Sequence, residues 1–152
     1  MKIYTLHYEI QIDRPLQEVF TFFSRPENLA RITPRSLGFV ILTPEPIEMR
    51  EGTRIQYSIK LLGIRAGWTS LITGYDPPHR FVDEQVHGPY CSWRHEHSFK
   101  EVQAGTLVTD DVQYAVPLGY IGRLTHLLFI RRQLEMIFSY RAKVLAQIFH
   151  QA

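Results

Sequence analysis

PLGYIGRLTHLLFIRRQLEMIFSYRAKVLAQIFH, residues 117–150, repeats apolar side chains at the spacing of an α-helix. The pattern holds for about 30 residues, which corresponds to a rod of about 45 Å at 1.5 Å per residue. One apolar stripe is formed by Leu127, Ile130, Leu134, Phe138, Leu145 and Ile148. A helix with such a stripe needs an apolar surface elsewhere in the chain to pack against.

The chain before this helix has the pattern of a β-sheet. Residues 3–12 alternate apolar and polar side chains, as a half-buried strand does. Proline and glycine turns then separate further predicted strands at 39–43, 53–62, 64–75, 80–86, 90–102 and 106–116. The links between them are too short for parallel crossovers, so neighbouring strands must pair antiparallel. A sheet of about seven strands twists and curls.

Two short helices are predicted after the first strand. Asp13 offers an N-cap carboxylate, and Pro15 suits the first turn of the first helix. Ser24 and Glu27 have the capping-box spacing for a second helix that ends near Ile32.

The sequence therefore predicts an α+β fold, in which a curved antiparallel sheet of about seven strands wraps around the long C-terminal helix. The 152 residues, 45% hydrophobic and 21% charged, are enough for one core. Because no linker or internal repeat divides them, we expect residues 1–152 to form one domain.

The charge and cysteine content indicate which partners and which cellular compartment to expect. The formal charge of +2 is spread along the chain without a basic run, so nucleic acid is not expected as a partner. The single Cys91 fits a reducing compartment. The N-terminus has no apolar signal region and no apolar run could span a bilayer, so we expect a cytoplasmic protein without an integral membrane segment. Nothing in the sequence indicates the oligomeric state.

The strand predicted at 90–102 carries two histidines on its apolar face. His95 and His97 share that face with Trp93 and Phe99, while the intervening positions are polar. Buried imidazole rings need hydrogen-bond partners. We favour an arrangement in which both rings line a cavity and contact tyrosines, water or a ligand.

A metal site is the alternative for the same histidine pair. Side chains two apart on a strand lie about 6.6 Å apart along it, close enough to chelate one ion. The third ligand would come from Cys91 or Asp110, or more distantly from His87 or His7. A Cys91–His95 nucleophile pair is not supported, since these positions lie about 13 Å apart along a strand.

Two charged residues also fall on apolar faces. Arg141 lies in the middle of the helical stripe, and Asp110 shares the apolar face of the last predicted strand with Tyr114. We favour a buried ion pair between Arg141 and Asp110 that fixes the helix to the sheet. The alternative, which can hold at the same time, is an anchor for the polar head group of a ligand.

The order of the elements and four stretches of sequence resemble a known superfamily. The stretches are ITGYDPPHRFVDEQ (72–85), GPYCSWRHEHSF (88–99), DDVQYAVPLG (110–119) and IFSYR (137–141). Over nearly its whole length the chain resembles the helix-grip START/birch-pollen-allergen superfamily, also called SRPBCC or polyketide cyclase-like, and within it the bacterial ligand-binding subgroup. The resemblance implies an apolar cavity between sheet and helix for lipids, sterols, polyketides, quinones or similar molecules, with catalysis in only some members.

We therefore expect the chain to bind, carry or sense a hydrophobic or amphipathic small molecule. The predicted ligand-binding residues are Trp93, His95, His97, Phe99, Asp110, Tyr114, Phe138 and Arg141. We favour a binding module over an enzyme, assign no catalytic residue, and expect no cofactor and no metal. No GxSxG, P-loop, GxGxxG or HExxH motif supports a common enzyme class.

Two alternatives stay open. One is a cyclase- or aromatase-like enzyme in which a cavity histidine acts as general acid or base on a polyketide-like or quinone-like substrate. The other is a metal-dependent protein that uses His95 and His97.

Overall fold

The protein is built on one seven-stranded sheet, seen in a computed structural model that describes residues 1–61 and 63–150. The strands are β1 (Tyr4–Ile12), β2 (Val40–Ile41), β3 (Arg54–Leu61), β4 (Ile64–Asp76), β5 (Arg80–His87), β6 (Ser92–Val102) and β7 (Gly105–Ala115). Their order across the sheet is β1-β7-β6-β5-β4-β3-β2, and every neighbouring pair is antiparallel. The predicted antiparallel sheet of seven strands is confirmed.

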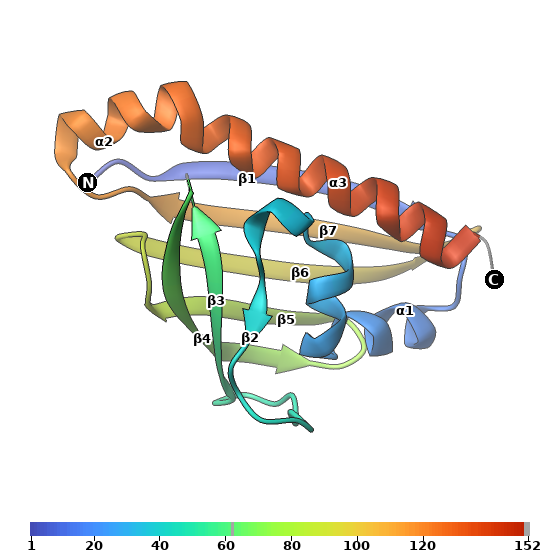
Figure 1. The fold of residues 1–152 in the computed structure, drawn as a ribbon. Helices are drawn as coiled ribbons and strands as arrows, with labels where there is room; N and C mark the ends of the chain where they lie inside the picture. The colour runs from blue at the N-terminus through green and yellow to red at the C-terminus, as the bar shows by residue number, and fades with distance from the viewer. Residues whose placement is uncertain (62, 151–152) are drawn as a thin grey trace.

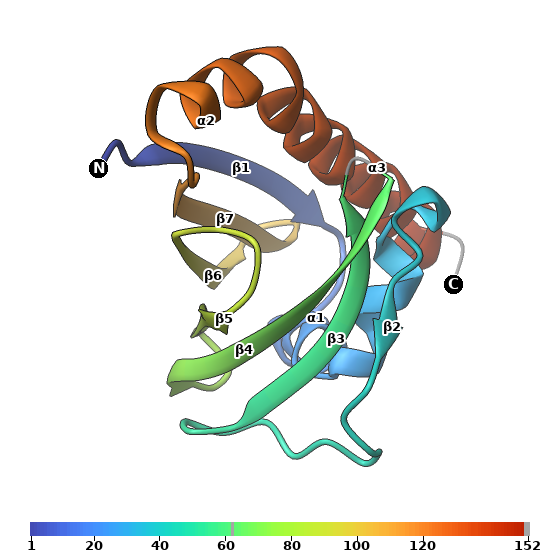
Figure 2. The same ribbon diagram turned by 60° about the vertical axis from the view of Figure 1, so that its left-hand side comes forward.

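Helical segments lie before β2 and after β7. The first group comprises α1 (Leu16–Phe23) and two 3₁₀ helices, η1 (Pro26–Ile32) and η2 (Arg35–Leu37). The second group is a continuous rod made of α2 (Gly119–Thr125), a π-helical segment η3 (His126–Ile130) and α3 (Arg131–His150). Figures 1 and 2 show the sheet curving around the space next to this rod. The predicted α+β helix-grip arrangement is therefore confirmed.

The two predicted helix caps are wrong. The N-cap of α1 is Pro15 rather than Asp13, and no side chain caps the helix. Ser24 does not begin the second helix, because its hydroxyl donates to the Thr21 carbonyl oxygen at 3.2 Å and so completes the end of α1. The N-cap of η1 is Arg25.

The residues that face the core do not follow one unbroken helical stripe along the C-terminal rod. Leu134, Phe138 and Leu145 are buried as predicted, but Leu127 is 73% exposed. The π-helical segment η3 explains the difference, since hydrogen bonds from i to i+5 rotate the residues before it relative to those after it. Near the C-terminus the buried residue is Phe149, whereas the predicted Ile148 is only partly buried.

The core consists of two clusters of buried side chains. One gathers around α1 and the end of α3, with Phe20, Phe99 and Leu145. The other gathers on the sheet under the middle of the rod, with Trp68 and Phe138. Members of both clusters line the cavity described below. Among the described helices, none combines the length and the hydrophobicity that a transmembrane segment needs.

Candidate functional site

A cavity of about 170 Å³ lies between the concave side of the sheet and α3. Its walls come from α1, η1, η2, strands β2 to β6 and α3, and most of the lining side chains are apolar or aromatic. The wall includes Trp68 and Trp93, the two tryptophans of the chain. A few polar groups interrupt this lining, and one group of them consists of the two histidines of β6 with Asp83 of β5.

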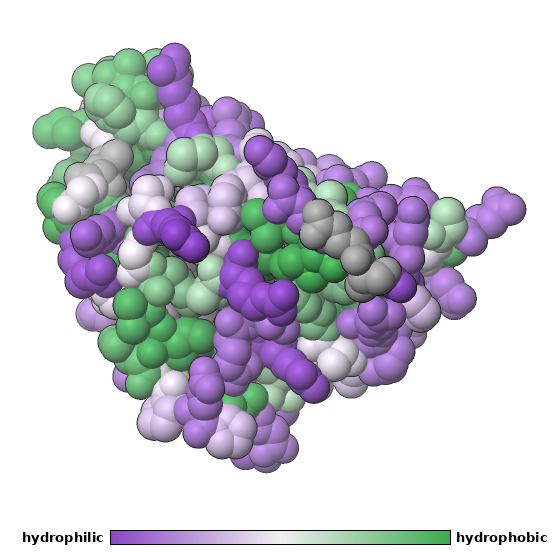
Figure 3. Space-filling model, turned by 45° about the vertical axis from the view of Figure 1, so that its right-hand side comes forward, coloured by the Kyte–Doolittle hydropathy of each residue, from purple (hydrophilic) through white to green (hydrophobic). Residues whose placement is uncertain are grey.

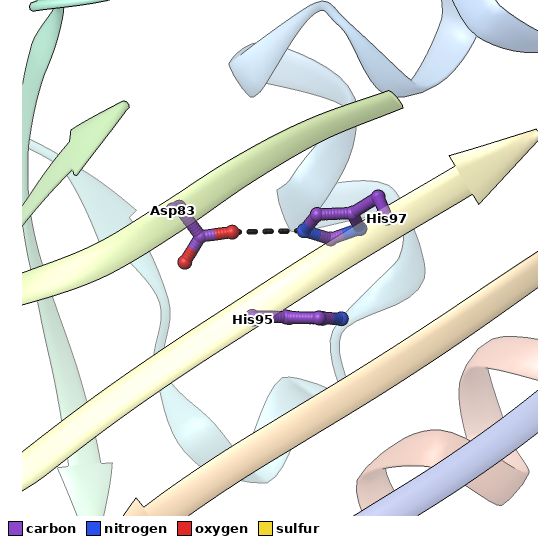
Figure 4. A group of neighbouring side chains, drawn as sticks. All are labelled: Asp83, His95 and His97. Carbon is purple, nitrogen blue, oxygen red and sulfur yellow. Dashed lines mark hydrogen bonds and ion pairs between the residues drawn. The ribbon is translucent and has the colours of Figure 1, made fainter. Parts of the chain in front are cut away.

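His95 and His97 point from β6 into the cavity. Their side chains are 7% and 9% exposed, so the predicted inward face of this strand is correct. The two rings stack with centroids 3.7 Å apart and planes inclined by 28°. Phe81 stacks on His97 from the other side at 4.2 Å. Figure 4 shows both rings with Asp83, which reaches toward them from β5.

Each histidine donates to a different carboxylate. His95 Nε2 donates to Asp110 Oδ1 at 2.7 Å. His97 Nε2 donates to Asp83 Oδ2 at 2.8 Å, the bond drawn as a dashed line in Figure 4. His97 Nδ1 lies 3.2 Å from Asp110 Oδ1, within ion-pair distance but outside hydrogen-bond geometry. The two carboxylates therefore enclose the imidazole pair.

Strand register places these four groups together. Asp83 of β5 is the cross-strand partner of His95, and Asp110 of β7 is the cross-strand partner of His97. Paired residues of antiparallel strands project on the same face, so both acids lie beside the histidines. Asp83 was not among the predicted site residues. The sequence did contain a sign of its role. Asp83 lies two residues after Phe81 and so on the same face of β5, and an acid on an apolar face needs a partner.

The environment pushes the two imidazole pKa values apart. Burial and the neighbouring His97 lower the pKa of His95 below 6.5, despite its bond to Asp110. Burial would also lower the pKa of His97, but its close contacts with Asp110 and Asp83 and their negative charges outweigh burial and raise that pKa above 6.5. Burial opposes ionisation of both carboxyls, yet the two histidines hold the pKa values of Asp83 and Asp110 below their usual range. His97 therefore binds a proton more readily than an ordinary histidine, and His95 less readily.

Arg141 lines the cavity from α3 and has no polar partner in the described part of the chain. It is 8% exposed, and its buried Nε has no hydrogen-bond partner. Its Cζ lies 5.1 Å from the centroid of the Phe138 ring. The predicted ion pair with Asp110 is wrong, since none within 4 Å is found among the described residues. Asp110 is held by the histidines instead.

The remaining predicted site residues fall into two groups. Trp93 and Phe138 lie in the cavity wall with the two histidines and Arg141. Phe99, Asp110 and Tyr114 lie behind the wall. Phe99 packs in the core against α1, and Tyr114 contacts His126 Nε2 at 2.6 Å through its hydroxyl. These three would shape the site without facing its interior.

One group of side chains has ligand atoms close enough for a metal ion. The carboxylate of Asp83 and ring nitrogens of His95 and His97 lie within 4.8 Å of one another. Of the third ligands predicted from sequence, Asp110 meets the pair through its contacts with both histidines. Cys91, His87 and His7 are exposed and do not. His7 instead contacts Asp111 and Glu9 on the outer face of the sheet.

Comparison with protein families gives one match. The family described as "Polyketide cyclase / dehydrase and lipid transport" matches residues 12–150. None of the curated proteins matches the sequence.

Several solved structures share the fold. The Zhui aromatase/cyclase from Streptomyces sp. R1128 has a TM-score of 0.76 at 13% identity, covering 99% of this chain and 95% of its own. A START superfamily protein from Mycobacterium smegmatis has a TM-score of 0.72 at 12% identity, with 97% of each chain covered. The protein TTHA0849 from Thermus thermophilus has a TM-score of 0.73 at 15% identity, covering 95% of this chain and 99% of its own. At these identities the similarity establishes the fold alone.

Proposed function

Because the chain belongs to the polyketide cyclase / dehydrase and lipid transport family, within the START-like (SRPBCC) superfamily, we propose that it binds a hydrophobic or amphipathic small molecule between its sheet and α3. The observation that carries the proposal is the cavity itself, whose apolar walls enclose a small group of converging polar side chains. Such a combination is typical of small-molecule sites.

The size of the cavity indicates the size of the buried group. Its 170 Å³ is close to the roughly 150 Å³ of an engineered apolar cavity that holds benzene. It is smaller than the roughly 300–1,000 Å³ of drug-sized pockets. We therefore expect one ring, or a short run of an aliphatic chain, to occupy the described space.

Arg141 indicates the chemistry of the polar end. A buried donor without a partner costs free energy, and a ligand oxygen could accept from its Nε. With His97 protonated and both Asp83 and Asp110 ionised, two positive and two negative charges meet at the site. These charges already balance, so a charged ligand group would add an unpaired buried charge. A neutral ligand oxygen could accept a hydrogen bond from Arg141 without doing so. We propose a ketone or quinone oxygen as this acceptor.

Tryptophan fluorescence offers a direct test. Both tryptophans of the chain line the cavity, so an occupant should change their emission. We would titrate benzene, acetophenone and benzoate, which share one ring and differ in the polar end. We expect saturable binding, with acetophenone the tightest. Saturable binding of none of the three, together with an empty cavity by native mass spectrometry after gentle lysis, would contradict it.

Arg141→Met separates the polar contact from the apolar one. It should weaken the binding of acetophenone by roughly 10- to 100-fold, the range for a hydrogen bond to a charged group, and leave the binding of benzene nearly unchanged. Lys143→Met is the matched control, because Lys143 is exposed on the same helix and does not line the cavity. An equal loss of affinity for both probes would indicate that Arg141 maintains the shape of the cavity and does not contact the ligand oxygen.

A second candidate is a cyclase-like enzyme, favoured by the paired imidazoles. His95 is buried with a lowered pKa and stacks on His97, whose pKa is raised, so one ring suited to act as a base and one suited to act as an acid face the same cavity. Such an enzyme would convert a polyketide-like or quinone-like substrate. Turnover of an identified substrate should be lost in the double variant His95→Gln with His97→Gln. Unchanged turnover would remove this candidate and leave binding alone.

A further inference from the structure

The first turns of the C-terminal rod expose a large apolar surface that neither the cavity nor the core uses. Seven side chains form it: Leu118, Tyr120, Ile121, Leu124, Leu127, Leu128 and Phe129. We name these residues the helix-tip surface. Their exposed fractions run from 49% for Leu128 to 85% for Tyr120. In Figure 3 hydrophobic surface gathers at the upper left, over this end of the rod.

The opposite side of the same turns is fixed to the body of the protein. Gly122 lies so close to Pro117 that a Cβ on it would overlap the Pro117 carbonyl oxygen. His126 stacks on Tyr4 with centroids 3.5 Å apart and contacts the Tyr114 hydroxyl at 2.6 Å. The helix therefore cannot roll its apolar side inward without losing these contacts.

The apolar side is a continuous stripe rather than scattered residues. Positions 120, 121, 124, 127 and 128 follow the i, i+1, i+4, i+7, i+8 spacing of one helix face. A helix that packs one side on protein normally turns polar residues outward. Single exposed apolar residues are common, but a contiguous patch marks a site of interaction.

The charges around the helix-tip surface are positive. Residues 112–134 contain no Asp or Glu. Arg123 lies with its Cζ 5.2 Å from the centroid of the Tyr120 ring, and Arg132 is exposed. Lys2 adds a further cation on the N-terminal segment, which lies beside α2 in Figures 1 and 2.

From this apolar stripe, its fixed orientation and its positive rim, we propose that the helix-tip surface docks onto an anionic lipid bilayer. The leucines, Ile121 and Phe129 would enter the boundary of the acyl chains, while Arg123 and Arg132 extend to lipid phosphates. Such a helix lies in the membrane interface without spanning it. The proposal does not depend on what the cavity holds.

A second copy of the chain fits this surface less well. A symmetric dimer through the stripe would bring Arg123 and Arg132 of both copies close together, and residues 112–134 offer no acid to pair with them. An anionic membrane surface supplies the opposite charge.

Vesicle co-sedimentation tests the proposal. We expect the protein to bind vesicles of equal parts phosphatidylcholine and phosphatidylglycerol, to bind pure phosphatidylcholine much less, and to be released partly by high salt. No binding to the anionic vesicles would overturn the proposal. A second result would also overturn it: the protein sediments with neither kind of vesicle, light scattering shows a dimer, and Leu127→Ser abolishes that dimer.

Variants separate the apolar and charged contributions. Leu124→Ser with Leu127→Ser should weaken binding to the anionic vesicles about tenfold or more, because two buried leucines are lost. Arg123→Gln with Arg132→Gln should weaken it about fivefold for each arginine. Leu42→Ser, at a residue 58% exposed beside β2, is the control and should bind as the parent does. Unfolding midpoints would check that each variant is folded, and parental binding by both test pairs would refute the proposal.

Discussion

His95 and His97 stack with ring centroids 3.7 Å apart, yet their Nε2 atoms donate to carboxylates on opposite neighbouring strands. At this distance both rings cannot be protonated without strong repulsion. His97 lies within 3.2 Å of both Asp83 and Asp110, whereas His95 bonds only to Asp110. The proton of the pair therefore resides on His97.

NMR should resolve the two protonation states. At pH 6.5, the ordinary histidine value, we expect His97 to be mostly protonated and His95 mostly neutral, because their pKa values shift in opposite directions. Ring ¹⁵N shifts followed through a pH titration would measure both. Asp83→Asn should lower the pKa of His97, while Asp111→Asn, which removes a partner of the exposed His7, should not. Identical titration curves for the two rings would contradict the assignment.

The free energy of unfolding should depend on pH with a sign set by each ring. The pKa of folded His97 is raised, so its stabilising contribution is complete below pH 6.5 and is lost as the pH rises through the folded value. The pKa of His95 is lowered, so the fold loses stability as the pH falls below 6.5. His97→Gln should reduce the alkaline decline and His95→Gln the acid one, while His7, whose pKa is raised, and His126, whose pKa is lowered, keep their own contributions. Urea unfolding across this range tests both, with the exposed His150→Gln as the variant that should retain both declines.

Asp110→Asn should destabilise the fold by about 2 kcal/mol or more, since it replaces a buried carboxylate by a neutral amide and so weakens a charge-assisted hydrogen bond and a buried ion pair. The adjacent Asp111→Asn should cost less than about 1 kcal/mol, because its ion pair with His7 is exposed. Chemical unfolding at pH 7 compares the two variants. Equal effects would show that the buried carboxylate is no more important than the surface one.

Gly122→Ala should destabilise the protein although alanine is the better helix former. Helix propensity favours alanine by about 1 kcal/mol, but the new Cβ would overlap the Pro117 carbonyl oxygen. Relieving that clash requires α2 to move, so we expect a net loss of about 1–3 kcal/mol, typical of overpacking. A rise in the unfolding midpoint would mean that α2 can shift without cost.

Purified protein should contain no stoichiometric metal. The Nε2 atoms of His95 and His97 already donate to carboxylates, and a metal ion would have to break the bond between His97 and Asp83 or use the remaining nitrogens. Elemental analysis for zinc, iron and nickel checks this expectation. One ion per chain, lost in Asp83→Ala but retained in Asp111→Ala, would instead establish the metal-dependent alternative.

Periodicity was sufficient to predict the strands and the helical rod. The alternation around His95 follows from the two-residue period of a strand, so which side chains face inward could be read from the sequence. Strand boundaries differed by a few residues, as at β2, where the predicted strand 39–43 is only Val40–Ile41.

Pairing between distant residues could not be read in the same way. Asp110 was expected to meet Arg141, because both are charged and both lie on apolar faces. Its actual partners are determined by the register of β6 on β7, which places His97 directly opposite. Asp83 was missed for the same reason, since its role appears only when β5 is aligned with β6. Periodicity gives the direction of a side chain but not its neighbour across the sheet.

The π-helical segment His126–Ile130 sets the angle between two functional faces of one rod. The exposed apolar stripe runs along α2 and into this segment, and the turns after it direct Arg141 into the cavity. Deleting a single residue there would rotate one face by about 100° against the other, at 3.6 residues per turn. Insertions and deletions within these five positions are therefore far more disruptive than substitutions, and the length of this short segment is under stricter constraint than its composition.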